Sequence, residues 1–157
     1  MNALTSNPIM RAVFASLTAL ASIALAADAG SGDPVKSPIG PDKVVYHLSA
    51  GLEQAGDGLR NIRNHLEVNP KARIVVVAHA AGVDYLMKGK KDRNGNPYET
   101  IVEQLELEGV RFEVCEITLR SRNLKRDQFI EQATFVPSGV AEIARLQQRE
   151  GYAYLRP

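Results

Sequence analysis

The chain has 157 residues, of which 45% are hydrophobic and 24% charged, which is an ordinary globular composition at a length that suits one domain. Its 19 basic and 18 acidic residues give a formal net charge of +1, so charge provides no attraction for nucleic acid or an anionic membrane, and we expect neither as a partner. The cysteine Cys115 stands alone, which excludes a disulfide within the chain.

The first 26 residues have the organisation of a secretory signal peptide. Arg11 provides a positive charge, residues 12–25 form an uncharged apolar run, and Ala24-Leu25-Ala26 offers small residues before a cleavage point. A buried core helix would also explain an apolar run, but not this order of parts, and an uncleaved anchor is the other alternative. We therefore expect cleavage after Ala26, export to the periplasm and no stable membrane insertion of the mature chain, in which 18 basic residues balance 18 acidic ones.

Residues 27–42 are rich in Gly, Pro, Ser and Asp and are expected to form a flexible leader before a domain spanning residues 43–157. The domain opens with a short β-branched run, residues 44–48, that predicts a buried strand. Apolar residues then recur at helical spacing until Asn69-Pro70 ends the pattern. Residues 74–78 are continuously hydrophobic, which predicts a strand covered on both faces, as in a parallel sheet.

The second half continues the alternation of strands and helices. After a polar loop at residues 88–96, Asn96 and Pro97 suit the N-cap and first position of a helix that ends near Gly109. The remaining expected elements are a strand at 110–115, a short helix around 125–132, a strand at 134–136, a helix from Pro137-Ser138 to about Arg149, and a strand at 152–155. The alternation predicts an α/β fold: a three-layer α/β/α domain with a mostly parallel sheet of about five strands.

Polar residues follow several of these strands. Ligands bind outside the carboxyl ends of the strands in open α/β sheets. The groups expected at that rim are His47 and Ser49 after the first strand, His79 after the second, Cys115 at the end of the third and Ser138 after the fourth.

Cys115 has two interpretations. Free cysteines commonly behave as small buried hydrophobes. A reactive thiolate instead needs partial exposure and a positive environment, which Arg120 and Arg122 nearby in sequence, and His79 one strand away, could provide.

The sequence contains no motif for binding a metal ion, a phosphate group or a dinucleotide. Three scattered histidines and one cysteine lack metal-site spacing, so we expect no metal. The basic stretch at 88–91 lacks the pattern of a phosphate loop, and the glycine-containing segment 51–58 lacks dinucleotide-binding spacing. We expect no cofactor.

Several segments together resemble the DsrE/DsrF-like family. They are the glycine, strand and cysteine of residues 109–115, the turn at 79–86, residues 136–140 and residues 146–154. The resemblance extends from about residue 43 to residue 157, and the order of elements agrees with it. It implies a compact α/β/α domain that assembles into trimers or hexamers.

In some members of that family, a cysteine at the position matching Cys115 carries a persulfide in sulfur relay. The resemblance therefore implies a sulfur carrier whose partner is a sulfur donor or acceptor protein or a small sulfur compound, with at most a sulfurtransferase-like activity. The residues expected around the substrate are His79, Gly82, Arg120 and Ser138. The alternative is a non-catalytic module for small-ligand binding or oligomeric assembly with a structural cysteine, which full burial of Cys115 would favour.

Overall fold

The computed structural model describes residues 41–157, so the predicted signal peptide and most of the predicted leader lie outside the described residues. In chain order the elements are β1 (Lys43–Leu48), α1 (Gly51–Val68), β2 (Arg73–Ala78), the 3₁₀ helix η1 (Ala80–Leu86), α2 (Tyr98–Leu107), β3 (Arg111–Cys115), α3 (Glu116–Ser121), the 3₁₀ helix η2 (Arg126–Gln128), β4 (Ala133–Val136), α4 (Gly139–Glu150) and β5 (Ala153–Leu155).

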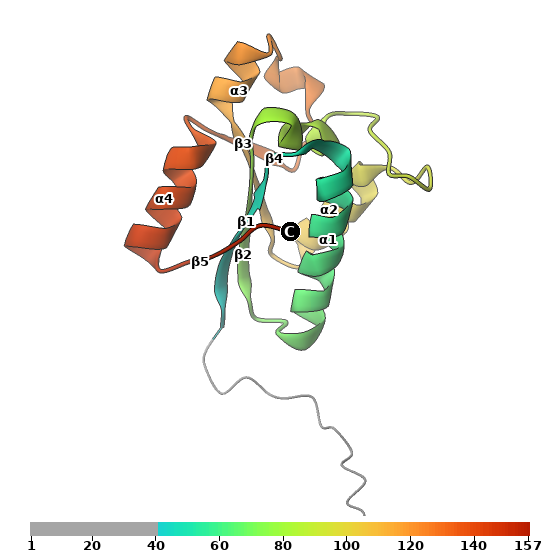
Figure 1. Cartoon of the computed structure of the whole chain (residues 1–157). Coiled ribbons are helices and arrows are strands. Elements are labelled where there is room, and N and C mark those ends of the chain that lie inside the picture. Colours follow the sequence, from blue (N-terminus) through green and yellow to red (C-terminus); the bar gives the residue numbers. More distant parts are fainter. Residues whose placement is uncertain (1–40) are drawn as a thin grey trace, which may run out of the picture. The chain divides into compact units, whose positions relative to one another are not determined.

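The five strands form one parallel sheet in the order β4-β3-β2-β1-β5 (Figure 1). Consecutive strands β1 to β4 lie side by side, so their carboxyl ends meet at one edge of the sheet. The last strand, β5, returns to pair with the first. The predicted three-layer α/β/α fold is confirmed.

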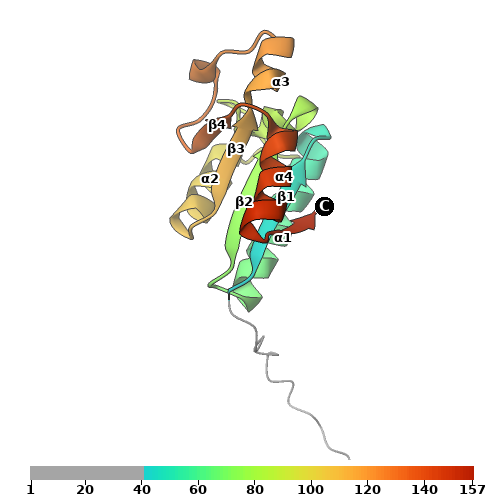
Figure 2. The ribbon, with the colours of Figure 1, turned by 90° about the vertical axis from the view of Figure 1, so that its left-hand side faces the viewer.

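Helices cover both faces of the sheet, but unequally. Side chains from α1, η1 and α2 form the larger core with one face of the sheet. On the opposite face, Ile143 and Leu146 of α4 form a smaller core with Val45, Val75 and Val77. Figure 2 shows α4 lying across β1 and β2 on this face, which we call the α4 face. Because side chains alternate along a strand, His47 lies on the same face as Val45.

The start of α2 differs from the prediction by one residue. Asn96 does not cap the helix, because its backbone N–H and its side-chain amide bind the carboxylate of Asp92 and close the preceding loop. Pro97 therefore takes the N-cap position with an extended backbone, and the helix begins at Tyr98. Local side-chain bonding of this kind competes with helix capping at Asn and Asp residues.

The expected helix around residues 125–132 is wrong. Only Arg126–Gln128 forms a single 3₁₀ turn, because the segment after it is held in extended contacts: Phe129 bridges to Met87, and the N–H of Ile130 binds the carbonyl of Leu86. The helical residues lie earlier, in α3, which follows directly on β3 and which the sequence pattern did not indicate.

Glu113 is a carboxylate in the middle of β3 on the α4 face. It is 7% exposed, one of its oxygens has no hydrogen-bond partner among residues 41–157, and Arg111 is 3.8 Å away. Burial, reinforced by the negative charge of Glu142, raises the pKa of Glu113 above its ordinary value. The ionised carboxylate therefore destabilises the fold at neutral pH.

We expect Glu113→Gln to stabilise the protein at pH 7 by about 1 kcal/mol, because the neutral amide avoids burying a charge. A carboxyl with a raised folded-state pKa costs stability only where it ionises, so the gain should vanish as the pH falls below the ordinary glutamate range. Urea unfolding at several pH values measures this, with Glu106→Gln on the exposed side of α2 as the control. A variant less stable than wild type at pH 7 would contradict the prediction.

Candidate functional site

The predicted rim exists at the carboxyl ends of the strands. The pairing of β2 with β3 ends at Ala78 and Val114, so the next residues, His79 and Cys115, occupy neighbouring positions at the sheet edge. Gly139, the first residue of α4, packs between them: a methyl group in place of its hydrogen would lie 3.2 Å from Cβ of Cys115 and 3.4 Å from Cβ of His79. The structure thus brings the predicted cysteine and histidine to one place.

The thiol of Cys115 lies just where β3 becomes α3. Cys115 is the last residue of the strand and the N-cap of the helix, and it is 4% exposed in the single chain. A reagent can therefore contact the sulfur only after a local displacement of the surrounding residues.

The hydrogen-bond donors around Cys115 favour its thiolate. Burial raises the pKa of the thiol. Hydrogen bonds to the sulfur from the backbone N–H groups of Gly139, Thr118 and Ile117, and from the hydroxyl of Thr118, act in the opposite direction. Together they outweigh burial, so the pKa of Cys115 lies below its ordinary value. A buried, inert cysteine does not need such a set of donors.

Thr118 is held in place from the other side by the turn after β2. Its hydroxyl accepts a hydrogen bond of 2.9 Å from the backbone N–H of Ala80, which leaves the hydroxyl proton free to point at the sulfur. Ala80 has a φ of +50°, an uncommon conformation for a residue with a side chain. Arg122 fixes this turn by donating to the carbonyl of Ala80 and pairing with Asp84 at 2.7 Å.

Beside the thiol, two histidines and a tyrosine form a continuous chain of contacts. Nε2 of His47 lies 2.6 Å from Nε2 of His79, and Nδ1 of His47 lies 2.6 Å from the hydroxyl oxygen of Tyr154. The chain therefore connects β1, the turn after β2, and β5.

Both imidazoles are uncharged at neutral pH. Burial, together with the nearby charges of His79 and Arg156, lowers the pKa of His47 to about 4. Burial and the charge of Arg156 lower the pKa of His79 in the same way. The guanidinium of Arg156 also lies 3.4 Å from the hydroxyl of Ser49.

The other predicted site residues have positions that suggest structural contributions, and their binding roles stay predictions. Gly82 lies against the end of β1, where a methyl group would come within 2.2 Å of the carbonyl oxygen of Leu48. Ser138 caps α4 by accepting a hydrogen bond from the N–H of Ala141. Arg120 lines a depression with Glu116 and Arg126, and Cys115 and His79 do not line it.

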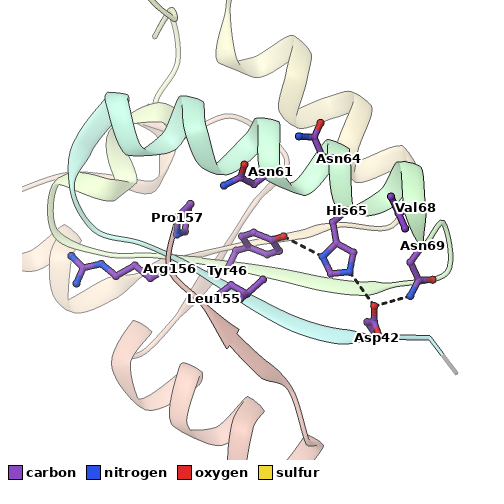
Figure 3. Close-up of a pocket in the computed structure, with 10 residues that line it drawn as sticks. All are labelled: Asp42, Tyr46, Asn61, Asn64, His65, Val68, Asn69, Leu155, Arg156 and Pro157. Carbon is purple, nitrogen blue, oxygen red and sulfur yellow. Dashed lines mark hydrogen bonds and ion pairs between the residues drawn. The ribbon is translucent and has the colours of Figure 1, made fainter. Parts of the chain in front are cut away.

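A cleft with a volume of about 500 Å³ lies elsewhere, between α1 and β5 (Figure 3). Along it a second chain of polar contacts runs from the hydroxyl of Tyr46 to His65, and from His65 to Asp42, which also binds Asn69. Figure 3 shows these groups lining one side of the cleft, with Arg156 at the opposite end from Asp42. Cys115 does not line this cleft.

Residues 41–157 contain neither a cluster of metal ligands nor a helix able to span a membrane. No three side chains of His, Cys, Asp or Glu gather there as a metal ion would require. Within the same residues, no helix combines the length and the apolar character that crossing a membrane demands.

The sequence analysis placed His47 at the rim but not among the residues around the substrate, and it did not single out Tyr154, Thr118 or Gly139. A signal for His47 was present: it follows Val45 by two residues, just as His79 follows Val77, so strand alternation places both histidines on one face. The contribution of Tyr154 depends on which strand β5 joins, and no local pattern reveals that.

Comparison with known proteins adds the family. Residues 18–157 match the sequence model of the DsrE/DsrF-like family. A protein of unknown function from Methanobacterium thermoautotrophicum is similar in structure with a TM-score of 0.65 and 34% sequence identity, covering 74% of this chain and 99% of its own. The ychN protein from E. coli has a TM-score of 0.63 with the same coverage but 16% identity, which shows a shared fold alone. No curated protein matches. On the family match and the shared fold, the chain belongs to the DsrE/DsrF-like family.

Proposed function

We propose that the protein is a sulfur carrier that holds a sulfane sulfur on Cys115 as a persulfide and passes it on. The observation that carries the proposal is the set of donors on the Cys115 sulfur, which lowers the pKa of the thiol despite burial. A larger thiolate fraction at neutral pH supports nucleophilic attack on a sulfur donor. Membership of a family with sulfur-relay members agrees with this.

The same donors suit the product. A persulfide places one more sulfur beyond the sulfur of Cys115, and its terminal atom carries negative charge when ionised. Backbone N–H groups at a fixed position stabilise such charge without having to reorganise. The nearby imidazoles are neutral and add no attraction of their own.

The location and partners of the carrier form part of the proposal. The order of Arg11, an apolar run and Ala24-x-Ala26 supports export to the periplasm. There the carrier would act as a homo-oligomer, a trimer or hexamer, and exchange sulfur with a donor or acceptor protein or a small sulfur compound.

A non-catalytic binding or assembly module is the second candidate. The 4% exposure of Cys115 favours it, and so does the cleft between α1 and β5, which contains polar and apolar groups but not the thiol. The two candidates differ in whether Cys115 reacts in the folded protein.

The experiment is intact mass spectrometry of the protein isolated from the periplasmic fraction without reductant, before and after incubation with a polysulfide or thiosulfate. We expect a chain beginning at Ala27 that gains the mass of one sulfur atom, and no gain in Cys115→Ser. Iodoacetamide labelling against pH should give a midpoint below the free-thiol value of about 8.5. Labelling that begins only on unfolding, with no sulfur adduct from either donor, would contradict the carrier and favour the binding or assembly module.

A further inference from the structure

The contacts from Tyr154 through His47 to His79 connect the surface to the neighbourhood of Cys115. Tyr154 is 40% exposed, so water reaches its hydroxyl. His79 lies at the other end, beside Gly139, where an added methyl group would lie 3.4 Å from Cβ of His79 and 3.2 Å from Cβ of Cys115. The contact of His79 with His47 uses Nε2, so Nδ1 is the ring nitrogen left for exchange with a substrate.

Neutral imidazoles permit two arrangements of protons along this chain. In the first, the tyrosine hydroxyl donates to Nδ1 of His47, whose Nε2–H donates to Nε2 of His79, and the proton of His79 stays on Nδ1. In the second, Nε2–H of His79 donates to His47, whose Nδ1–H donates to the tyrosine oxygen. The two arrangements differ by one proton at each end, so switching between them moves a proton along the chain.

Cys115 does not need these histidines to form its thiolate. Its sulfur already receives hydrogen bonds from three backbone N–H groups and from Thr118. A sulfur-transfer reaction has a second requirement, a proton for the departing thiolate, which leaves slowly when it is strongly basic. The hydrogen-bond donors on Cys115 cannot supply this proton, because neither a backbone N–H group nor a threonine hydroxyl is acidic enough to give one up.

We propose that Tyr154, His47 and His79 form a proton wire that protonates the departing thiolate when Cys115 takes sulfur from an alkyl persulfide, and that recovers a proton when the sulfur is passed on. This inference rests on the proposed carrier function and adds a substrate class, persulfides whose leaving thiol is strongly basic.

Loading of Cys115 transfers one sulfur atom to the protein and one proton to the departing thiolate. The thiolate of Cys115 attacks the sulfane sulfur of R–S–S⁻, a new S–S bond forms at Cys115, and the S–S bond of the donor breaks to release R–S⁻. Nδ1 of His79 gives its proton to R–S⁻, the proton on His47 moves to His79, and the tyrosine hydroxyl refills His47 and is itself refilled from water. No net oxidation or reduction occurs.

Unloading returns the wire to its first arrangement. An acceptor thiol R′–SH loses its proton to Nδ1 of His79 and attacks the sulfane sulfur, which leaves Cys115 as a thiolate and forms R′–S–S⁻. The protons on the two histidines shift back towards Tyr154, and one leaves to water. Burial, with the charge of Arg156, lowers the pKa of both histidines, which keeps the rings neutral between steps and so ready to donate or accept.

The test compares two disulfides that react with Cys115 whether or not the protein carries sulfur. Hydroxyethyl disulfide releases a strongly basic thiolate, and a dipyridyl disulfide releases a weakly basic one. Positioned general acids contribute about 100-fold or more to proton-dependent steps. We therefore expect His79→Gln, His47→Gln and Tyr154→Phe to slow the first reaction by at least about 10-fold and the second by less than about 2-fold. His65→Gln, at the separate contact with Asp42, is the control.

A structural disturbance would slow both disulfides alike, as well as iodoacetamide labelling, and that result would overturn the wire. Equal rates in variants and wild type would overturn it too. The variants could react more slowly with hydroxyethyl disulfide alone while the wild type forms no sulfur adduct. That result would support the proton wire and contradict the carrier function. If Cys115 reacts with none of the reagents in the folded protein, both the wire and the carrier fail.

Discussion

Gly82→Ala should destabilise the protein by about 3 kcal/mol or more, because overpacking against a rigid backbone is costly. The added methyl group would lie 2.2 Å from the carbonyl oxygen of Leu48 and 2.6 Å from the nitrogen of Ser49. Both atoms belong to the main chain at the end of β1 and cannot rotate away as a side chain could. The turn that holds His79 and Ala80 would therefore have to move off the sheet.

Urea or thermal unfolding measures this effect. Gly56→Ala is the matched control: its methyl group would meet only the hydroxyl of Tyr98, at an ordinary contact distance of 3.5 Å, within helix α1. Alanine is about 1 kcal/mol better than glycine in a helix, so the control should be neutral or stabilising. Equal stability of the Gly82 variant and the wild type would mean that the close approach between η1 and β1 does not exist.

Thr118→Val should raise the pKa of Cys115 by about one unit, since a hydrogen bond to a charged group contributes about 1.5–3 kcal/mol and one unit corresponds to about 1.4 kcal/mol. Valine keeps the shape of the buried threonine but removes the hydroxyl that donates to the sulfur. At a pH below both midpoints, iodoacetamide labelling should become about 10-fold slower, because the thiolate fraction there falls tenfold for each unit.

The pH profile separates this effect from altered access. At a pH above both midpoints the two proteins are equally ionised and should label at the same rate. Thr118→Ser retains the hydroxyl and should keep the wild-type midpoint. A reduced rate at every pH would contradict the prediction, because it would show that the valine blocks access to the sulfur and leaves its ionisation unchanged.

The sheet could be predicted because its strands carry strong local signals. Residues 74–78 are hydrophobic without interruption, and this pattern has one common explanation, a strand buried on both faces. The helix after Ser138 ends at Gly151, whose φ of +72° is the left-handed conformation that favours glycine. Short sequence windows contain both signals, and the alternation of strand and helix then fixes the fold class.

The surroundings of Cys115 depend on contacts that short windows do not contain. Thr118 matters because α3 follows β3 without a loop and because the turn after β2 donates to its hydroxyl. α3 is only six residues long, too short for a periodic pattern to reveal it. Arg122 came closer to the expected site than Arg120, and only the three-dimensional arrangement of the turn distinguishes the two.

The pairing of β5 with β1 affects the order in which the protein can be completed. Tyr154 contacts His47 across 107 positions of sequence, and Arg156, two residues later, reaches Ser49 at 3.4 Å. A chain emerges from the ribosome, or from an export channel, with its earlier residues first, so β1 to β3 are available to pair before these residues are. The two histidines can therefore meet before Tyr154 arrives, and their link to water forms afterwards.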